Sequence, residues 1–204
     1  YRPRDITAYA CARLRAVVDD EPKPDSMPAP PELPDASGYV GRFAARDGTV
    51  LTVDIDPRGL TAQLGEQTLA LQQSGEAAFT AADPAVTPLP LVFRKAGDRV
   101  ARAWWGETEY VRQGVAFSRP TPAKLAALTG YYESDDPWRG SFRVIAQGPD
   151  LTIDGTTPLT PLGENLFRAG KDNWSPERLR FSAWLDGRPQ RATASGADYQ
   201  RRPA

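Results

Sequence analysis

The chain has 204 residues, of which 40% are hydrophobic and 25% charged, and its formal net charge is −1. This length predicts one or two domains, and a near-neutral chain with scattered basic residues lacks the electrostatic surface that nucleic-acid binding uses. Histidine is absent and Cys11 is the only cysteine, which excludes Ser-His-Asp catalysis, Cys-His catalysis and an internal disulfide.

Targeting signals are equally sparse. No apolar run approaches the roughly 18 residues of a membrane span, so no membrane span is expected. No signal peptide is recognisable, and a chain that begins at Tyr1 is expected to be a fragment or a processed product. The compartment, cytoplasmic or periplasmic, is left open.

The N-terminal part, residues 1–36, is expected to be a helix followed by a linker. Apolar residues recur at helical spacing from Asp5 to Val18, with Asp5 placed to cap the helix. So short a helix is marginal alone, so its apolar face needs a partner. Six prolines between Glu21 and Asp35 predict an extended connector.

Residues 37–114 change to a period of two. Leu51, Val53 and Ile55 alternate with polar residues, and seven or eight short segments of this kind follow one another, separated by turn residues. Asp83–Pro90 is the one long irregular connection. The segments predict an antiparallel sheet closed into a barrel, which hides its edges.

Residues 115–204 repeat this plan. After a linker at Gly114–Pro122 and one helical turn, Phe142, Val144 and Ala146 match the first alternating strand, and Leu159 and Leu162 match Leu69 and Leu71. Leu179, Phe181, Ala183 and Leu185 predict a half-buried strand, with a hairpin at Asp186-Gly187. The fold class is therefore all-β, with two tandem eight-stranded antiparallel barrels. Because such small units bury little surface, we expect the barrels to pack on each other or on a further domain.

Few residues suggest chemistry. Glu133, Asp135 and Asp136 are interpreted as solvated loop charge rather than an acid–base pair, and no metal or cofactor site is expected. Adjacent tryptophans on a strand face opposite ways, so one of Trp104 and Trp105 is expected in the core and the other at a surface or contact. Trp138, at a loop tip, is either a lid on its own barrel or a contact with a partner domain.

A family resemblance is carried by a series of segments in the second repeat. They are Pro137-Trp138, Ser141–Val144, Pro158–Gly163, Phe167–Gly170, Ser175–Phe181 and Ser195–Tyr199. Together with the N-terminal helix and proline linker, they resemble the C-terminal region of bacterial serine hydrolases of the class C β-lactamase and penicillin-binding-protein group. D-aminopeptidase-like members of that group carry two lipocalin-like barrels behind a catalytic domain, and a barrel loop can restrict access to the active site.

The resemblance implies a non-catalytic region. Catalysis in this group belongs to an upstream serine in a Ser-x-x-Lys motif, which no serine of this chain provides, so the chain alone is not expected to be an enzyme. The expected partner is an upstream or associated serine hydrolase domain, and homo-oligomers are left open. The alternative is a lipocalin-like module that binds a small molecule inside a barrel.

Two polar, tryptophan-bearing loops are the candidates for contact with a partner or its active site. They span Glu133–Gly140 and Lys171–Glu177, and their candidate residues are Asp135, Asp136, Trp138, Arg139, Lys171 and Trp174.

Overall fold

The computed structural model describes residues 3–22, 36–57, 59–81, 88–97 and 99–203. The chain divides into two compact units, Tyr1–Pro34 and Asp35–Ala204. The first unit contains helix α1 (Pro3–Val18), and the second contains a 3-10 helix η1 (Ala36–Tyr39), a short helix α2 (Ala123–Ala126) and sixteen strands. No described helix is both long and apolar enough to cross a membrane.

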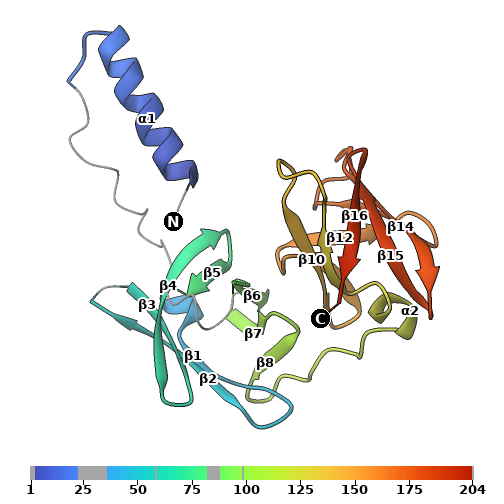
Figure 1. Cartoon of the computed structure of the whole chain (residues 1–204). Coiled ribbons are helices and arrows are strands. Elements are labelled where there is room, and N and C mark those ends of the chain that lie inside the picture. The colour runs from blue at the N-terminus through green and yellow to red at the C-terminus, as the bar shows by residue number, and fades with distance from the viewer. Residues whose placement is uncertain (1–2, 23–35, 58, 82–87, 98, 204) are drawn as a thin grey trace. The chain divides into compact units, whose positions relative to one another are not determined.

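The strands form two closed antiparallel barrels of eight strands each, as the sequence predicts (Figure 1). In barrel 1 each strand pairs with the next along the chain, and β8 pairs with β1 to close the ring. Its strands are β1 (Gly41–Ala44), β2 (Val50–Asp56), β3 (Gly59–Leu64), β4 (Gln67–Gly75), β5 (Ala78–Ala81), β6 (Leu91–Ala96), β7 (Arg99–Trp105) and β8 (Thr108–Arg112).

Barrel 2 repeats this topology, with β16 closing on β9. Its strands are β9 (Gly130–Glu133), β10 (Ser141–Gln147), β11 (Asp150–Ile153), β12 (Thr157–Pro161), β13 (Leu166–Ala169), β14 (Arg178–Leu185), β15 (Arg188–Ala194) and β16 (Ala197–Arg202). Two-residue turns set the register. Asp186 and Gly187, both with positive φ, join β14 to β15 as the sequence predicts, because this backbone matches the strand twist.

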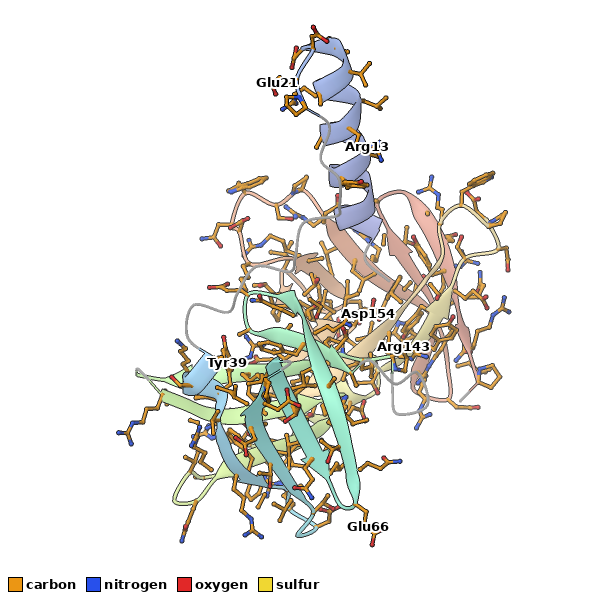
Figure 2. The ribbon with its side chains drawn as sticks, turned by 90° about the vertical axis from the view of Figure 1, so that its left-hand side faces the viewer. Arg13, Glu21, Tyr39, Glu66, Arg143 and Asp154 are labelled. Atoms are coloured by element: carbon orange, nitrogen blue, oxygen red, sulfur yellow. The ribbon has the colours of Figure 1, made fainter. Side chains whose placement is uncertain are left out.

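The interior of each barrel is filled by its own side chains. In barrel 1, Phe43, Phe79 and Phe93 are at most 2% exposed, and the centroid of the Phe93 ring lies 5.6 Å from that of Phe79 and 6.1 Å from that of Phe43. In barrel 2, Phe167 and Phe181 meet edge to face, and Tyr132 packs against Phe181. The core of barrel 2 comprises Leu128, Tyr132, Val144, Leu151, Leu159, Phe167, Leu179, Phe181 and Ala192. Side chains crowd both barrels in the stick view (Figure 2).

The same arginine–glycine contact joins the first and last strand of each barrel. Arg112, from β8, donates from Nη2 to the carbonyl of Val40, and its guanidinium lies over Gly41. Arg201, from β16, donates to the carbonyl of Thr129 at 2.6 Å over Gly130. Both glycines have positive φ, +150° and +156°, and no room for a Cβ. The equivalence shows at residue level that the two barrels are built on one plan.

Three details of the sequence prediction are wrong. Asp5 is the third residue of α1 rather than its cap, because the helix begins at Pro3, a residue suited to a first helical position. Leu162 was matched to the buried Leu71, but it is 43% exposed and lies in the turn that follows β12. Leu185 is 60% exposed because the buried face of β14 ends at Phe181, and Ala183, with φ +55°, and the residues that follow it in the strand are exposed.

Outward-facing side chains are buried on one side of each barrel. On barrel 1 they include Val92, Trp104 and Val111, and on barrel 2 Ile145 and Thr152. Lys171 of barrel 2 forms an ion pair of 3.2 Å with Glu76 of barrel 1. The expectation that the barrels pack on each other is confirmed. The proline connector and the long connection at 83–90 fall largely on residues 23–35 and 82–87, outside the described residues.

Candidate functional site

Both predicted contact loops emerge from the same end of barrel 2. Residues 134–140 join β9 to β10 and residues 170–177 join β13 to β14. Alternate connections of an up-and-down barrel lie at one end, which assigns both loops, with the turns 154–156 and 195–196, to that end. The two loops are separated by four strands in a ring of eight, so they stand on opposite sides of the barrel mouth.

The loop 134–140 is held by its own hydrogen bonds and projects a tryptophan. Asp136 Oδ1 accepts from the backbone N–H of Trp138 at 3.0 Å, and Asp136 Oδ2 pairs with Arg139 at 3.3 Å. Ser134 N–H donates to the carbonyl of Gly140 at 3.2 Å and closes the base of the loop. With its backbone fixed in this way, Trp138 is 93% exposed. It does not plug its own barrel, and its contact with a partner stays a prediction.

The loop 170–177 is fixed in a similar way. Asn173 Oδ1 accepts from Arg168 at 2.8 Å, and Ser175 Oγ donates to the carbonyl of Ala169 at 2.8 Å. Trp174 is 79% exposed between these anchors. Lys171, also predicted as a contact residue, instead forms the ion pair with Glu76 of barrel 1.

The acidic residues beside Trp138 are solvated ion pairs. Arg202 binds Glu133 at 2.8 Å and Asp135 at 3.3 Å, and these two carboxylate side chains are 43% and 81% exposed. The hydrogen bond and charge of Glu133 raise the pKa of Arg202. Carboxylates that are each paired with arginine in water do not form the sheltered acid–base pair that glycosidic or peptide hydrolysis uses.

A partly buried carboxylate, that of Asp154, also belongs to this end of barrel 2. Asp154 Oδ1 accepts from the backbone N–H of Arg143 at 2.8 Å, and the two residues lie together in Figure 2. Burial raises the pKa of Asp154, while the hydrogen bond and charge of Arg143 lower it. Asp154 has φ +50° at the start of the β11–β12 turn, so its carboxylate fixes that turn.

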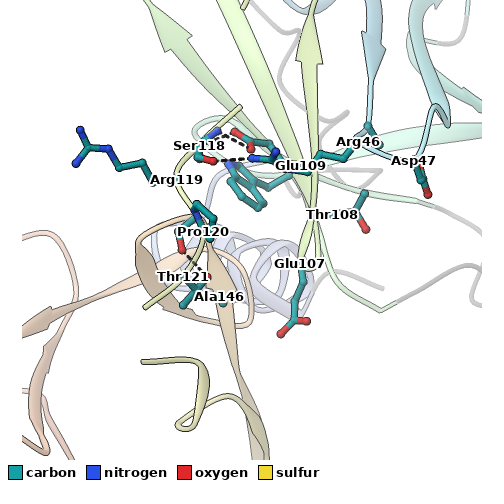
Figure 3. Close-up of a pocket in the computed structure, with 13 residues that line it drawn as sticks. Arg46, Asp47, Glu107, Thr108, Glu109, Ser118, Arg119, Pro120, Thr121 and Ala146 are labelled. Carbon is teal, nitrogen blue, oxygen red and sulfur yellow. Dashed lines mark hydrogen bonds between the residues drawn. The ribbon is translucent and has the colours of Figure 1, made fainter. Parts of the chain in front are cut away.

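A second cluster surrounds the linker between the barrels (Figure 3). Glu109, only 7% exposed, accepts hydrogen bonds from Arg102 at 3.0 Å, from Ser118 Oγ at 2.6 Å and from Ser118 N–H at 2.9 Å. Arg46 donates to the Ser118 carbonyl at 2.7 Å. We call Arg102, Glu109 and Ser118 the linker anchor, because together they hold the linker 114–122 against β7 and β8.

The linker anchor borders a pocket of about 590 Å³, whose wall includes Trp104, Glu107 and Thr121. Ser118 is the one serine here with a carboxylate partner, but its hydroxyl lies between Glu109 and the Arg102 guanidinium, with no lysine beside it in the pocket lining. A serine nucleophile needs a base that can take its proton and release it to a leaving group. The hydrogen bonds of the Ser118 hydroxyl fix the linker. Among the described residues no group of three or more Cys, Asp or Glu side chains could hold a metal ion.

Both adjacent tryptophans are buried, at 6% for Trp104 and 7% for Trp105. Trp105 faces inward and donates from Nε1 to the carbonyl of Leu89 at 3.2 Å, whereas Trp104 faces outward beside the linker anchor. The prediction of opposite faces is confirmed, with Trp104 in a contact rather than at a free surface. The linker anchor itself was missed, because it joins three segments that no local pattern connects.

Comparisons with protein-family models, with curated proteins and with solved structures find no match for this chain.

Proposed function

We propose that this chain is the non-catalytic double-barrel region of a serine hydrolase related to class C β-lactamases and penicillin-binding proteins. In this proposal the barrels shape substrate access to, or assembly of, a catalytic domain that carries the Ser-x-x-Lys motif. One observation carries the proposal: the barrel interiors are filled, while one end of barrel 2 exposes two tryptophans on its loops. We call this end, with the loops 134–140 and 170–177, the rim. The interiors hold aromatic and aliphatic side chains of the chain itself, while two ordered loops expose Trp138 and Trp174.

The rim has the character of a contact surface. Tryptophan is enriched where proteins meet partners, because its large ring loses little conformational freedom on binding. The loops around both rings are already ordered by hydrogen bonds, so a partner would meet a preorganised surface. Trp138 and Trp174 lie on opposite sides of the barrel mouth. Their rings could therefore contact a partner at two separate points, for example on either side of a cleft.

The alternative of a small apolar ligand inside a barrel receives no support from the packing. A lipocalin-like site needs a cavity of roughly 300 Å³ or more within the ring. The described interior of barrel 2 is instead crossed by contacts of Phe181 with Tyr132 and with Phe167.

The reading frame that precedes the Tyr1 codon tests the parent class, and the protein it encodes tests the role of the rim. We expect a Ser-x-x-Lys domain in that frame. In the encoded protein, Trp138→Ala or Trp174→Ala should change kcat/KM for bulky amide substrates by about tenfold. Trp184→Ala is the matched control, since Trp184 is 45% exposed near the β14–β15 turn at the other end of barrel 2. The proposal would be contradicted by an upstream reading frame without the Ser-x-x-Lys motif. It would also be contradicted if the Trp138, Trp174 and Trp184 variants all had the same kcat/KM.

A further inference from the structure

Three arginines stand together on the outer face of barrel 2, on the neighbouring strands β13 and β14. Leu179 of β14 is buried in the interior, so the residues on either side of it, Arg178 and Arg180, face outward. Arg168 on β13 is the direct cross-strand neighbour of Arg178. Arg178 and Arg180 are exposed, and Arg168 is half-buried. We call Arg168, Arg178 and Arg180 the basic strip.

The charge of the basic strip is not compensated by an ion pair. Three other arginines of barrel 2, Arg139, Arg191 and Arg202, are each paired with a carboxylate. None of the members of the basic strip forms such a pair with any residue that the structure describes. Like charges on directly opposite positions of a sheet repel each other, so this arrangement costs stability. An anion bound from outside would offset the cost.

Two carboxylates lie in the loop that precedes β14, those of Asp172 and Glu177, and both residues are exposed. Glu177 accepts a hydrogen bond from the Ser195 hydroxyl. Even with both carboxylates counted, three guanidinium charges face two negative charges. The strip therefore keeps an excess of positive charge, and its free member, Arg180, is the one furthest along β14 from this loop.

Two arginines of the strip also fix the loop that carries Trp174. Arg168 donates to Asn173 Oδ1 at 2.8 Å, and Arg178 donates to the carbonyl of Ser175. These acceptors are neutral, so the hydrogen bonds hold the guanidinium groups in place without cancelling their charge. The basic strip is thus preorganised, which lowers the entropy that a partner loses on binding.

The spacing of the strip indicates which kind of anion fits it. Arg178 and Arg180 are two residues apart in β14, which separates them by about 7 Å. An extended polypeptide repeats this spacing, because its alternate side chains lie on one side. Acidic residues at alternate positions of such a segment can therefore meet both arginines, whose forked N–H donors match the two oxygens of a carboxylate.

We propose that the basic strip binds an extended acidic segment of a partner protein, with carboxylates at alternate positions on Arg178 and Arg180 and with Arg168 adding positive charge. A nucleic-acid backbone is disfavoured, because Asp172 and Glu177 beside the strip repel a continuous row of phosphates. The inference goes beyond the proposed hydrolase role and does not depend on it, since every group named belongs to this chain.

Fluorescence anisotropy of labelled peptides titrated with the whole chain tests the site. The probe is a peptide in which three glutamates alternate with valines, and its control has glutamine in place of each glutamate. We expect the acidic peptide to bind, and the glutamine peptide to bind at least about tenfold more weakly. A third peptide has the same composition with its glutamates adjacent, and it should also bind more weakly because the alternate spacing is lost.

Two arginine variants locate the binding site. Arg180→Gln should weaken binding of the acidic peptide by about tenfold. The variant should fold normally, because Arg180 is exposed and makes no hydrogen bond with the residues that the structure describes. Arg188→Gln is the matched control, since it removes an exposed arginine at the start of β15, outside the strip, and should leave the affinity unchanged.

Several results would overturn the proposal. They are failure of the acidic peptide to bind, equal binding of either control peptide, and equal effects of Arg180→Gln and Arg188→Gln. An oligothymidylate of the same length that binds as tightly as the acidic peptide would also overturn it, because the strip would then recognise phosphate charge. All these measurements use this chain without a catalytic domain, so their outcome is separate from that of the hydrolase proposal.

Discussion

At the scale of single residues, the barrels depend on a few side chains that tie the last strand to the first. Arg112 and Arg201 occupy equivalent places, each over a glycine at the start of the first strand. The sequence shows the repeated glycine, aromatic and arginine positions, so the equivalence could be predicted. Their contact could not, because the glycine and the arginine are about seventy residues apart and meet only when the ring closes.

Gly130→Ala should lower the free energy of unfolding by about 2 kcal/mol or more, from an unfavourable positive φ together with displacement of Arg201. Gly196→Ala is the control, because Gly196 has φ +77° with open space around it. It should cost only about 1 kcal/mol. Urea denaturation of both variants measures the difference, and equal losses would show that the arginine contact adds nothing.

Tyr132 makes barrel 2 sensitive to alkali. Burial raises the pKa of Tyr132 to about 12, from an ordinary value of 10.0, although the charge of Arg201 lowers it. The folded state therefore keeps its proton where the unfolded state loses it, and stability falls as the pH rises from 10 to 12. The phenol also donates to the Leu128 carbonyl at 2.8 Å.

Tyr132→Phe should cost about 1 kcal/mol at pH 7 through the lost hydrogen bond. The same variant should lose less stability than the parent chain between pH 10 and pH 12. Chemical denaturation at a series of pH values measures both effects. If the two proteins have parallel pH profiles, Tyr132 does not control the alkaline transition.

At the scale of strands, period-two patterning predicts most of the fold. Leu51 and Val53 of β2, and Phe142, Val144 and Ala146 of β10, face the interior as the sequence indicates. The alternation of buried and exposed residues fails in β14 at Ala183. This residue has a positive φ, which alanine seldom adopts and which the local sequence does not predict. The burial of outward-facing residues such as Val92 and Val111 was not predicted, because no local pattern shows which part of a barrel's outer face is covered.

Phe181→Ser should cost about 3 kcal/mol or more, since it removes a buried ring and leaves a hydroxyl unpaired in the core. Leu185→Ser, four residues further along the same strand, should change stability by less than about 0.5 kcal/mol, because Leu185 is 60% exposed. Thermal unfolding with a denaturant series compares the two. A large loss at Leu185 would mean that its side chain is packed in the core in solution.

At the scale of the whole molecule, the linker anchor connects the end of barrel 1 to the start of barrel 2. Glu109→Ala should destabilise barrel 1 by about 3 kcal/mol, because it leaves the partly buried Arg102 guanidinium and the Ser118 donors without their acceptor. It should also speed protease cleavage within residues 114–122. Glu107→Ala, two residues away and exposed, is the control and should change neither property. An uncut linker in the Glu109 variant would contradict the anchoring role.

For the candidate contact residues, too, the local sequence predicts some properties, while others depend on segments far apart in the chain. Tryptophan in a polar segment between strands is enough to predict the exposed loops at Trp138 and Trp174. Their places on opposite sides of one barrel mouth depend on strand order, which appears only once the ring is closed.

The central proposal is that the two barrels, each filled by its own side chains, perform no bond cleavage themselves. Hydrolysis of p-nitrophenyl esters and D-amino-acid amides by the purified chain tests it most directly, with Ser118→Ala purified in parallel because Ser118 is the serine bonded to a buried carboxylate. The account predicts that both proteins give only the background rate. Turnover that persists through purification and is lost in the Ser118→Ala protein would contradict it.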